Sequence, residues 1–424
     1  MKRILFIAQQ AFPIRSSECI CNSKVAHALA EAGYKVDVFT YTNKSTYKED
    51  EKIDSILRNS NNLNVYEIND KNHKYFLSRS YGLLTNIRNA IALFFMGCKI
   101  GYIYNGMANG FDIYNSIKSH LKSFDKFPYD IVITRAYDAE IIGIYLKKKY
   151  GVKWIANWND PYPTCRFPEP YGHGPDTKIK LGYRKVYKKV KQMVDYHTFP
   201  SERLKNYMID SFKTVDPNKT AVIPHMAYSK ILQNKKNKED KCIKFVSCGS
   251  VGAPRNPTLF IQALKEVVEE MCLSFNDIKC YFVGKYDHFL DKIVKDNYLD
   301  DIVTLVGSLQ YSDCLEFISS CDISLIIEAQ CKEGIYLPTK FADAVQCQIP
   351  VFCVSPENGT LHDLVNEYHN GYFSNNESLE SIKNTLKQAI TDYKNGTFPK
   401  VKKENMEYFF EDNIIKKFNS ILSE

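Results

Sequence analysis

Short apolar runs alternate with stretches of helical spacing along this chain, and this alternation occurs once in each half. In the first half, short apolar runs of the kind buried in parallel sheets predict strands, and stretches with helical spacing lie between them. These runs are residues 4–8, 35–41, 63–68, 129–135, 152–157, 195–201 and 220–225. A helix is expected over 18–32, ended by Gly33, so the chain opens with the strand–helix–strand unit of a parallel sheet.

A purely polar segment, 233–241, has the composition of a linker between domains. After it the pattern starts again. Strands are expected at 243–248, 279–283, 303–306, 323–327 and 351–354, and helices at 258–270, 361–366, 378–394 and 404–422. We therefore predict an α/β protein with an N-terminal domain (1–228), a linker (229–241), a C-terminal domain (242–400) and a C-terminal helix (401–424) that packs back on the N-terminal domain.

Composition excludes several classes of protein. The 424 residues are 44% hydrophobic and 25% charged, which is ordinary for two globular domains. The formal net charge of +7 suits an anionic ligand or an acidic membrane surface, but it is too small and dispersed to indicate a nucleic-acid partner. The 13 cysteines are scattered without zinc-type spacing, which favours reduced thiols in a cytoplasmic protein. We expect neither a signal peptide at residues 1–8 nor a membrane-spanning segment.

One apolar stretch, 86–104, allows two interpretations. Its apolar residues have helical spacing and are interrupted by Arg88 and Lys99. Such a stripe usually forms the core face of a helix, and that is our expectation. A helix that contacts a membrane or a lipid acceptor is the alternative.

The stretch 335–351 predicts an anion-binding site. It reads as a loop with Pro338 at its end, a short helix with Thr339 as the expected N-cap, and a buried strand. The first amides of a helix and the positive end of its dipole attract anions, and Lys340 adds a cation. One turn later, Asp343 leans back toward the helix start and could accept hydrogen bonds from two sugar hydroxyls. These groups favour a nucleotide or nucleotide-sugar, although a solvated amphipathic helix would have the same sequence.

Two glycine-containing turns in the second half could add further groups for a phosphate. Each follows a predicted strand and leads into a helix, so backbone amides become available there. The residues concerned are Gly249, Ser250, Gly252, Arg255, Gly359 and Thr360.

The first half offers fewer chemical signals. Its first loop has no Gly-x-Gly-x-x-Gly, which disfavours NAD. Arg15 and Ser16 could still meet an anion there, although an ordinary polar connection is the favoured interpretation for each of them. Asn159 and Asp160 follow the strand at 152–157, at the end of a sheet where ligands gather. An acceptor or catalytic role for Asp160 is expected, with a turn cap as the alternative.

In their order and spacing, the motifs resemble those of glycosyltransferase family 4, whose members move a sugar from a nucleotide donor with retention at the anomeric carbon. The second half carries the better matches, at 245–249, 255–257, 306–309, 321–325, 337–343 and 349–351. Looser matches lie at 30–36, 199–202 and 222–224. The resemblance implies the GT-B architecture, with two doubly wound Rossmann-like domains facing across a cleft.

The resemblance also implies roles for donor-binding residues. Asp343 takes the position of the second Glu in the family's E-x7-E motif, which holds the donor ribose. The first Glu falls on Ile335, which cannot do this, and Glu333 could substitute only if the loop is rearranged. Arg255 and Lys340 are expected to bind the diphosphate and to stabilise it as a leaving group.

By the same resemblance, Asn159 stands where the family often has His, and Asp160 would orient the acceptor. The implied activity is a retaining hexosyl transfer from a nucleotide-sugar to a glycan or lipid-linked acceptor, in bacterial surface polysaccharide synthesis. It requires no cofactor and no metal. The protein would be cytoplasmic, with peripheral contact with the inner membrane as an open alternative. A GT-B nucleotide-sugar epimerase and a non-catalytic nucleotide-sugar-binding protein are the rival interpretations.

Overall fold

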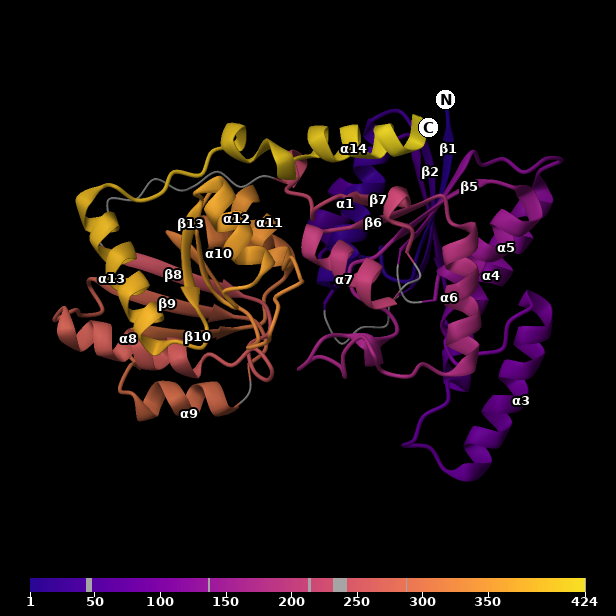
Figure 1. Cartoon of the computed structure of the whole chain (residues 1–424). Helices are drawn as coiled ribbons and strands as arrows, with labels where there is room; N and C mark the ends of the chain where they lie inside the picture. The colour runs from indigo at the N-terminus through magenta and orange to yellow at the C-terminus, as the bar shows by residue number, and fades with distance from the viewer. Residues whose placement is uncertain (43–47, 136–137, 213–214, 232–241, 287, 424) are drawn as a thin grey trace. The chain divides into compact units, whose positions relative to one another are not determined.

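The computed structural model describes residues 1–42, 48–135, 138–212, 215–231, 242–286 and 288–423 (Figure 1). Contacts within the chain divide it into two compact units. The first comprises Met1–Phe167, Gly172–Ile223 and Ile415–Glu424, and the second Pro168–Tyr171 and Pro224–Ile414. The division thus falls at Pro224 instead of at the expected linker 229–241, of which 232–241 lie outside the described residues. Of the predicted segment 401–424, only Ile415–Glu424 groups with the first unit.

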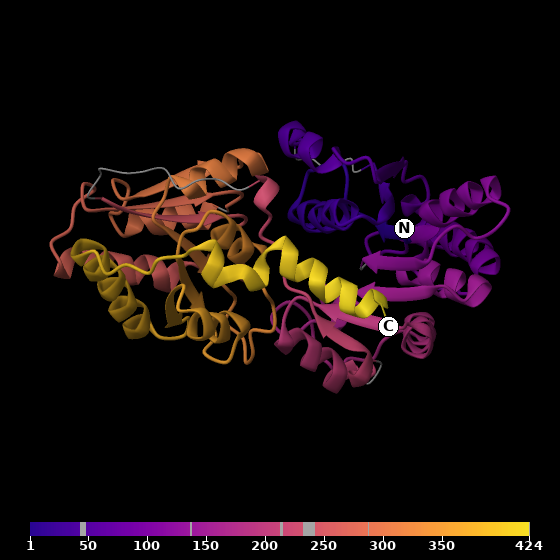
Figure 2. The same ribbon diagram turned by 90° about the horizontal axis from the view of Figure 1, so that it is seen from above.

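The first unit is built on a seven-stranded parallel sheet with helices on both faces (Figures 1 and 2). Its strands are β1 (Arg3–Ala8), β2 (Lys35–Tyr41), β3 (Leu63–Ile68), β4 (Ile131–Arg135), β5 (Lys153–Asn157), β6 (Tyr196–Phe199) and β7 (Thr220–Val222). The strand order is β3-β2-β1-β4-β5-β6-β7, so the winding direction changes between β1 and β4. The central strands are almost wholly buried, which explains why they appear in the sequence as continuous apolar runs.

Helices of the first unit fill the connections between these strands. They are α1 (Ser17–Glu31), α2 (Glu51–Arg58), α3 (Leu83–Ile100), α4 (Met107–His120), α5 (Glu140–Tyr150), α6 (Leu181–Met193) and α7 (Glu202–Phe212), with 3₁₀ turns η1 (His73–Tyr75), η2 (Leu121–Ser123), η3 (Thr164–Arg166) and η4 (Pro217–Lys219). The sequence interpretation missed α2 and α4. Helix α2 is short and lies in a polar stretch, although Ile53 and Leu57 have helical spacing, and α4 mixes glycine and polar residues with its apolar ones.

The second unit has a six-stranded parallel sheet in the order β10-β9-β8-β11-β12-β13, wound in opposite directions from β8 and β11. The strands are β8 (Ile243–Cys248), β9 (Ile278–Val283), β10 (Val303–Gly307), β11 (Ile323–Ile327), β12 (Val351–Ser355) and β13 (Gly371–Asn375). The helices are α8 (Thr258–Glu270), α9 (His288–Asp296), α10 (Tyr311–Ser319), α11 (Thr339–Gln346), α12 (Thr360–Tyr368) and α13 (Leu379–Asn395), with η5 (Ser229–Ile231). The last helix, α14 (Glu411–Ser423), begins in this unit, and its residues from Ile415 on group with the first unit. The edge strand β13 was not predicted. The expected architecture of two doubly wound α/β units is confirmed.

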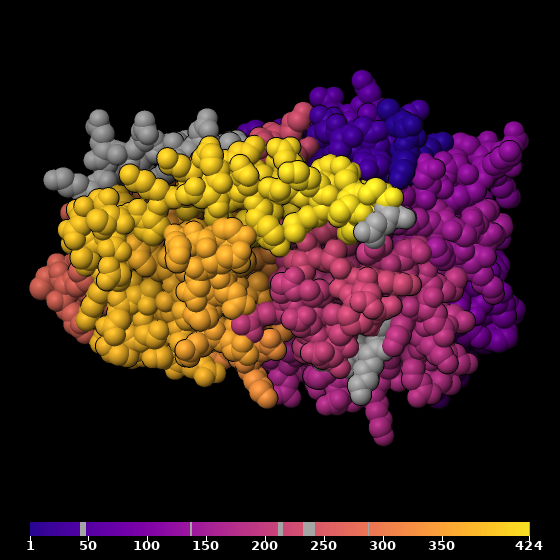
Figure 3. Space-filling model, turned by 45° about the horizontal axis from the view of Figure 1, so that its top comes forward, coloured from indigo at the N-terminus to yellow at the C-terminus, as the bar shows by residue number. Residues whose placement is uncertain are grey.

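The end of the chain differs from the single helix expected over 404–422. A 3₁₀ segment, η6 (Lys403–Phe409), precedes α14, and the backbone leaves helical geometry at Met406. Phe409 of η6 packs with its ring 5.3 Å from that of Phe341 in α11, which fixes η6 on the second unit. Figure 3 shows this part of the chain (yellow) on the molecular surface.

The expectation that 86–104 forms a core face is wrong for most of its apolar residues. In α3, Leu93, Met96 and Ile100 are buried, but a second set of large apolar side chains faces outward. This exposed set is Leu83, Leu84, Ile87, Ile91, Phe94 and Phe95. Among the described residues, α3 is the one helix whose length and composition would allow it to cross a membrane, a test that core helices of soluble proteins also pass.

Candidate functional site

The point in the second sheet where the winding direction changes, between β8 and β11, gathers several of the predicted residues. Ligands of doubly wound folds bind at the carboxyl ends of the strands at such a point, because the following loops diverge there. Gly249 and Ser250 follow β8 directly and are exposed, and Glu328 follows β11. The chemistry at this edge therefore comes from loops far apart in the sequence.

Gly249 makes room for Lys340 at this edge. Its φ of 111° lies in the region that favours glycine, and its amide donates to Val283 O at 2.7 Å. A Cβ at position 249 would lie 2.9 Å from Cε of Lys340, so any side chain there would displace the lysine. Gly252, with φ 140°, begins the turn that carries Arg255, and its amide donates to Arg255 O at 3.3 Å.

Arg255 forms an ion pair with Glu328, which the sequence interpretation missed. Arg255 Nε lies 3.2 Å from Glu328 Oε1, and the carboxylate side chain is only 10% exposed. Burial raises the pKa of Glu328, while the charges of Arg255 and Lys340 oppose that shift. Tyr171, which the contacts assign to the same unit, donates a hydrogen bond to Glu328 Oε2 at 3.4 Å. The position of Glu328, directly after a buried strand at the change of winding, was the signal that could have revealed it.

Lys340 lies in the first turn of α11 beside this pair. Pro338, not Thr339 as expected, occupies the N-cap position, since its backbone is extended and its carbonyl accepts from the Phe341 amide at 3.0 Å. No side chain caps this helix start, so the amides of Thr339 and Lys340, which precede Phe341, point out of the helix end. Burial, followed by the positive charge of Arg255, lowers the pKa of Lys340. Two cations and uncapped amides thus converge at a place that suits an anion.

Asp343 lies one turn further along α11. Its Oδ1 accepts a hydrogen bond from the Tyr311 hydroxyl at 2.5 Å, which orients the carboxylate at the start of α10. Asp343 also acts electrostatically on Lys340, so the two predicted residues belong to one site. The arrangement offers a carboxylate beside the cationic end of the helix.

The loop before α11 differs from the expected arrangement. Ile335 is fully buried and Glu333 half-buried, and Gly334 pairs with the loop before α12. The Gly334 amide donates to Asn358 O, and the Thr360 amide donates to Gly334 O, both at 2.8 Å. The expectation that the Thr360 amide faces a ligand is therefore wrong, because the protein itself uses it. Gly359, at the N-cap of α12, remains at the edge of this loop.

The remaining predicted residues belong to the first unit. Ser16 caps α1 by accepting from the Cys19 amide at 3.3 Å, and Arg15 pairs with Glu49 at 3.1 Å. Both residues therefore have structural roles, as in the alternative interpretation of this loop as an ordinary polar connection. Asn159 Nδ2 donates to both oxygens of Glu18, at 3.1 and 2.9 Å. Asp160 follows it, half-buried, after the carboxyl end of β5.

Two buried carboxylates after β4 were also missed. Asp138 accepts from Tyr162 at 2.9 Å and from Asn109 at 3.1 Å, and burial raises its pKa to about 6. Burial, aided by Asp138, raises the pKa of Glu140 to about 8. Both carboxylates are thus held in an environment that favours the neutral form.

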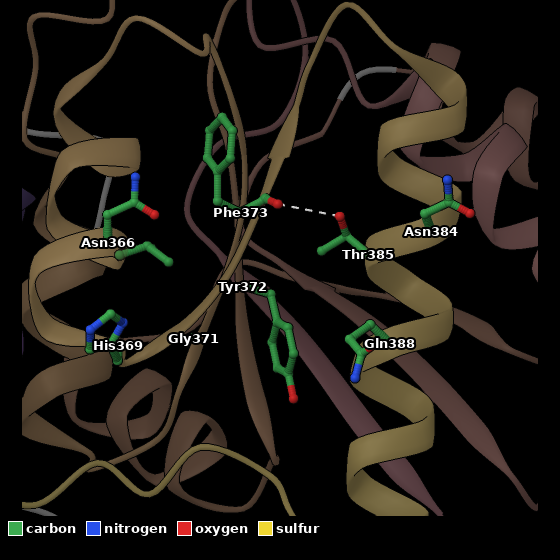
Figure 4. Close-up of a pocket in the computed structure, with 9 residues that line it drawn as sticks. Asn366, His369, Gly371, Tyr372, Phe373, Asn384, Thr385 and Gln388 are labelled. Carbon is green, nitrogen blue, oxygen red and sulfur yellow. Dashed lines mark hydrogen bonds between the residues drawn. The ribbon is translucent and has the colours of Figure 1, made fainter.

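A cavity of about 460 Å³ lies elsewhere in the second unit, at the edge strand β13 (Figure 4). Asn366 of α12 and His369, the C-cap residue of that helix, line it on one side, and Thr385 and Gln388 of α13 line it on the other. None of the predicted site residues belongs to its lining. Within the described part of the chain, no group of three or more His, Cys, Asp or Glu side chains could hold a metal ion. The 13 cysteines all lie within the described residues, and none of them forms a disulfide.

Comparison with known proteins identifies the family. The model of the family described as "Glycosyltransferase Family 4" matches residues 23–226, and that of "Glycosyl transferases group 1" matches residues 229–405. No curated protein sequence matches the chain.

Similar solved structures cover nearly the whole chain. Sucrose-phosphate synthase from Thermosynechococcus elongatus has a TM-score of 0.66 at 13% identity, over 99% of this chain and 98% of that one. Anabaena HepE in complex with UDP has a TM-score of 0.65 at 13% identity, with both chains fully covered. WaaG, a glycosyltransferase involved in lipopolysaccharide biosynthesis, has a TM-score of 0.56 at 12% identity, over 92% of each chain. At these identities the likeness shows the fold, and the two family matches show that the chain belongs to the GT-B glycosyltransferases, with a family 4 N-terminal domain and a group 1 C-terminal domain.

Proposed function

We propose that the protein transfers a hexosyl group from a nucleotide-sugar to a glycan or lipid-linked acceptor, with retention at the anomeric carbon. The observation that carries this proposal is the convergence of Arg255, Lys340 and the uncapped start of α11 where the winding of the second sheet changes. A diphosphate would receive hydrogen bonds from both cations and from the first amides of the helix. Asp343 would accept hydrogen bonds from the ribose hydroxyls.

The same groups would assist the bond-breaking step. Negative charge develops on the diphosphate as the bond between the anomeric carbon and its oxygen breaks, and fixed cations stabilise it. Removing one such donor typically slows the reaction about 10²–10³-fold. With Arg255 and Lys340 in this role, the reaction would need no metal ion. The departing phosphate would take the proton of the attacking acceptor hydroxyl on the same face, which gives retention, and Asp160 would orient the acceptor.

The setting of the reaction is also a proposal. Lipopolysaccharide and other glycosyltransferases among the similar structures support a role in bacterial surface polysaccharide synthesis. Such a role suits a cytoplasmic enzyme that works at the inner membrane, where lipid-linked acceptors lie. The UDP complexes among these structures make UDP and UDP-sugars the first ligands to test.

The test is a panel of nucleotide-sugars incubated with the purified protein, with and without EDTA. Release of free nucleoside diphosphate into solution, unaffected by EDTA and dependent on an added acceptor, would support a metal-independent transferase. The anomeric configuration of the product, read by NMR, tests retention. Conversion of the donor into an epimer without release of nucleotide would show the rival epimerase. Binding without either reaction would show a non-catalytic protein.

A further inference from the structure

Helix α3 presents a large apolar surface that the fold of the first unit leaves uncovered. Figure 1 shows α3 at the margin of that unit, away from the strands. Leu84, Ile87, Ile91, Phe94 and Phe95 recur at helical spacing, and their exposed fractions range from 49% to 82%. Leu83, at 77%, extends the patch at the helix start. Proteins that act in solution alone rarely keep so many large apolar side chains exposed together, so the patch indicates an interaction surface.

The opposite face of α3 is firmly attached to the protein. Asn89 is fully buried, and its Nδ2 donates to Phe76 O at 3.0 Å and Lys74 O at 3.3 Å. Gly97 allows the chain to turn back on the helix, since a Cβ there would lie 2.8 Å from Tyr102 O. A helix held in this way cannot cross a bilayer without losing these contacts. It can, however, lie along a surface with its outward face buried.

The segment of the sequence that contains α3 carries basic residues and no acidic ones. From Lys71 to Phe111 the sequence contains five basic residues and no Asp or Glu. The basic residues are Lys71, Lys74, Arg79, Arg88 and Lys99, and all five are exposed. An apolar patch with a basic rim complements the headgroups of anionic lipids above an apolar interior.

Helix α6 adds more positive charge next to the end of α3. Its first turn packs on the residues that follow α3, with the Tyr104 and Tyr183 rings 5.0 Å apart. Leu181 and Ile103, both more than half exposed, continue the apolar surface there. Between residues 177 and 194 there is no acidic residue. Seven basic residues in this interval are exposed: Lys178, Lys180, Arg184, Lys185, Lys188, Lys189 and Lys191.

We propose that the outward face of α3, with the basic residues around it, is the surface on which the protein binds an anionic lipid bilayer. Pairing of this face with its counterpart in a second copy is disfavoured, because a symmetric contact would bring the basic rims together. An anionic bilayer matches both the apolar and the charged parts of the surface. This inference concerns the first unit alone and does not depend on the donor chemistry proposed for the second.

The test is flotation of the full-length protein with vesicles of phosphatidylcholine and phosphatidylglycerol in equal parts, and with phosphatidylcholine alone. We expect binding to the mixed vesicles that weakens with added salt or without phosphatidylglycerol. Phe94→Ser combined with Phe95→Ser should lower the partition coefficient at least about tenfold, because two rings that the bilayer would bury are lost. Phe289→Ser, at an exposed phenylalanine of α9 in the second unit, is the matched control and should bind as the wild type does.

Thermal unfolding with and without UDP, measured on all variants, separates this proposal from the proposed function. If the double variant loses vesicle binding but keeps the wild-type melting temperature and the wild-type shift with UDP, an interfacial role for α3 is supported. If UDP does not shift the melting temperature of the wild type, the proposed function is weakened, but the vesicle result still supports this inference. Equal vesicle binding by the double variant would overturn the inference. So would a wild type that does not bind vesicles, or one that dimerises through this face instead.

Discussion

Arg255 Nε lies 3.2 Å from Oε1 of Glu328, where the loop after β8 meets the end of β11. The Glu328 side chain is nearly buried, whereas the Arg255 side chain is 38% exposed, so part of the arginine remains accessible. The carboxylate therefore holds the guanidinium in place before any ligand arrives. An Arg fixed in this way loses less freedom when it binds a diphosphate.

The Arg255–Glu328 pair predicts that stability and binding can be separated. Arg255→Ala leaves a buried carboxylate without its nearest cation, so the free energy of unfolding should fall by about 1–2 kcal/mol, between the values for exposed and buried pairs. Adding Glu328→Gln should restore most of this loss. UDP affinity, measured by calorimetry, should stay about 10–100-fold below the wild type in both variants, because neither has the guanidinium. Recovery of affinity in the double variant would contradict the assigned role of Arg255.

Lys340→Met predicts opposite effects on stability and on binding. The folded protein lowers the pKa of Lys340, so the charged lysine is disfavoured relative to the unfolded chain, and stability should rise with pH through the folded pKa. Methionine removes this cost, so the melting temperature near neutral pH should equal or exceed that of the wild type. UDP affinity should fall about 10–100-fold. Lys292→Met, at an exposed lysine of α9, should change neither. A variant that is less stable and still binds UDP would refute the assignment.

Asp343→Ala should distinguish the ribose contact from the phosphate contact. We expect it to weaken UDP binding about tenfold or more, since hydrogen bonds to a charged acceptor are lost. Binding of inorganic pyrophosphate should change little, because Arg255 and Lys340 remain. Tyr311→Phe keeps the carboxylate but removes the hydroxyl that orients it at 2.5 Å, so its effect on UDP should be smaller. Equal losses for both ligands in Asp343→Ala would place Asp343 at the phosphate instead.

The sequence predicted the strands and the cationic residues of the second unit because those signals are local. The apolar runs at 243–248 and 323–327 mark buried parallel strands, and the position of Arg255 and Lys340 at strand-to-helix turns follows from the order of elements. Glu328 was missed because the family's motif spacing places its first carboxylate position at Ile335, in the loop before α11. Its pairing with Arg255 joins residues that follow two different strands, and it is visible only once β8 and β11 are neighbours.

The interpretation of α3 failed for a different reason. Both of its faces are apolar, so the spacing of apolar residues does not tell which one packs inward. The deciding residue is Asn89, a polar side chain in the contact with η1, where it satisfies two backbone carbonyls. From the sequence alone, a polar residue such as Asn89 is expected to face solvent. The sequence therefore predicts that the face carrying Asn89 is the exposed one, although it is the buried one.

Glu140 predicts a pH dependence of stability. Its pKa of about 8 in the folded protein exceeds its ordinary value of 4.5, so the folded state binds more protons between these values. Stability should therefore fall as pH rises across this range, by up to about 1.4 kcal/mol per pH unit from this group. Glu140→Gln should flatten the profile, leaving the part due to Asp138, whose pKa is about 6. Denaturant unfolding at several pH values measures this. Glu404→Gln, at an exposed carboxylate, should leave the profile unchanged, and an equally steep profile in Glu140→Gln would refute the prediction.

Cys98 offers a probe of how α3 meets a bilayer without any substitution. It is exposed and lies one turn beyond Phe94 and Phe95, on the outward side of the helix. Cys272, in the second unit, is also exposed and serves as an internal control. With vesicles that contain phosphatidylglycerol, we expect alkylation of Cys98 by a water-soluble maleimide to slow about tenfold or more, since the apolar face enters the interface. Cys272 should react at an unchanged rate. Peptide mass spectrometry follows both rates in one sample. Protection of both cysteines would indicate non-specific adsorption, and protection of neither would mean that α3 does not enter the bilayer surface.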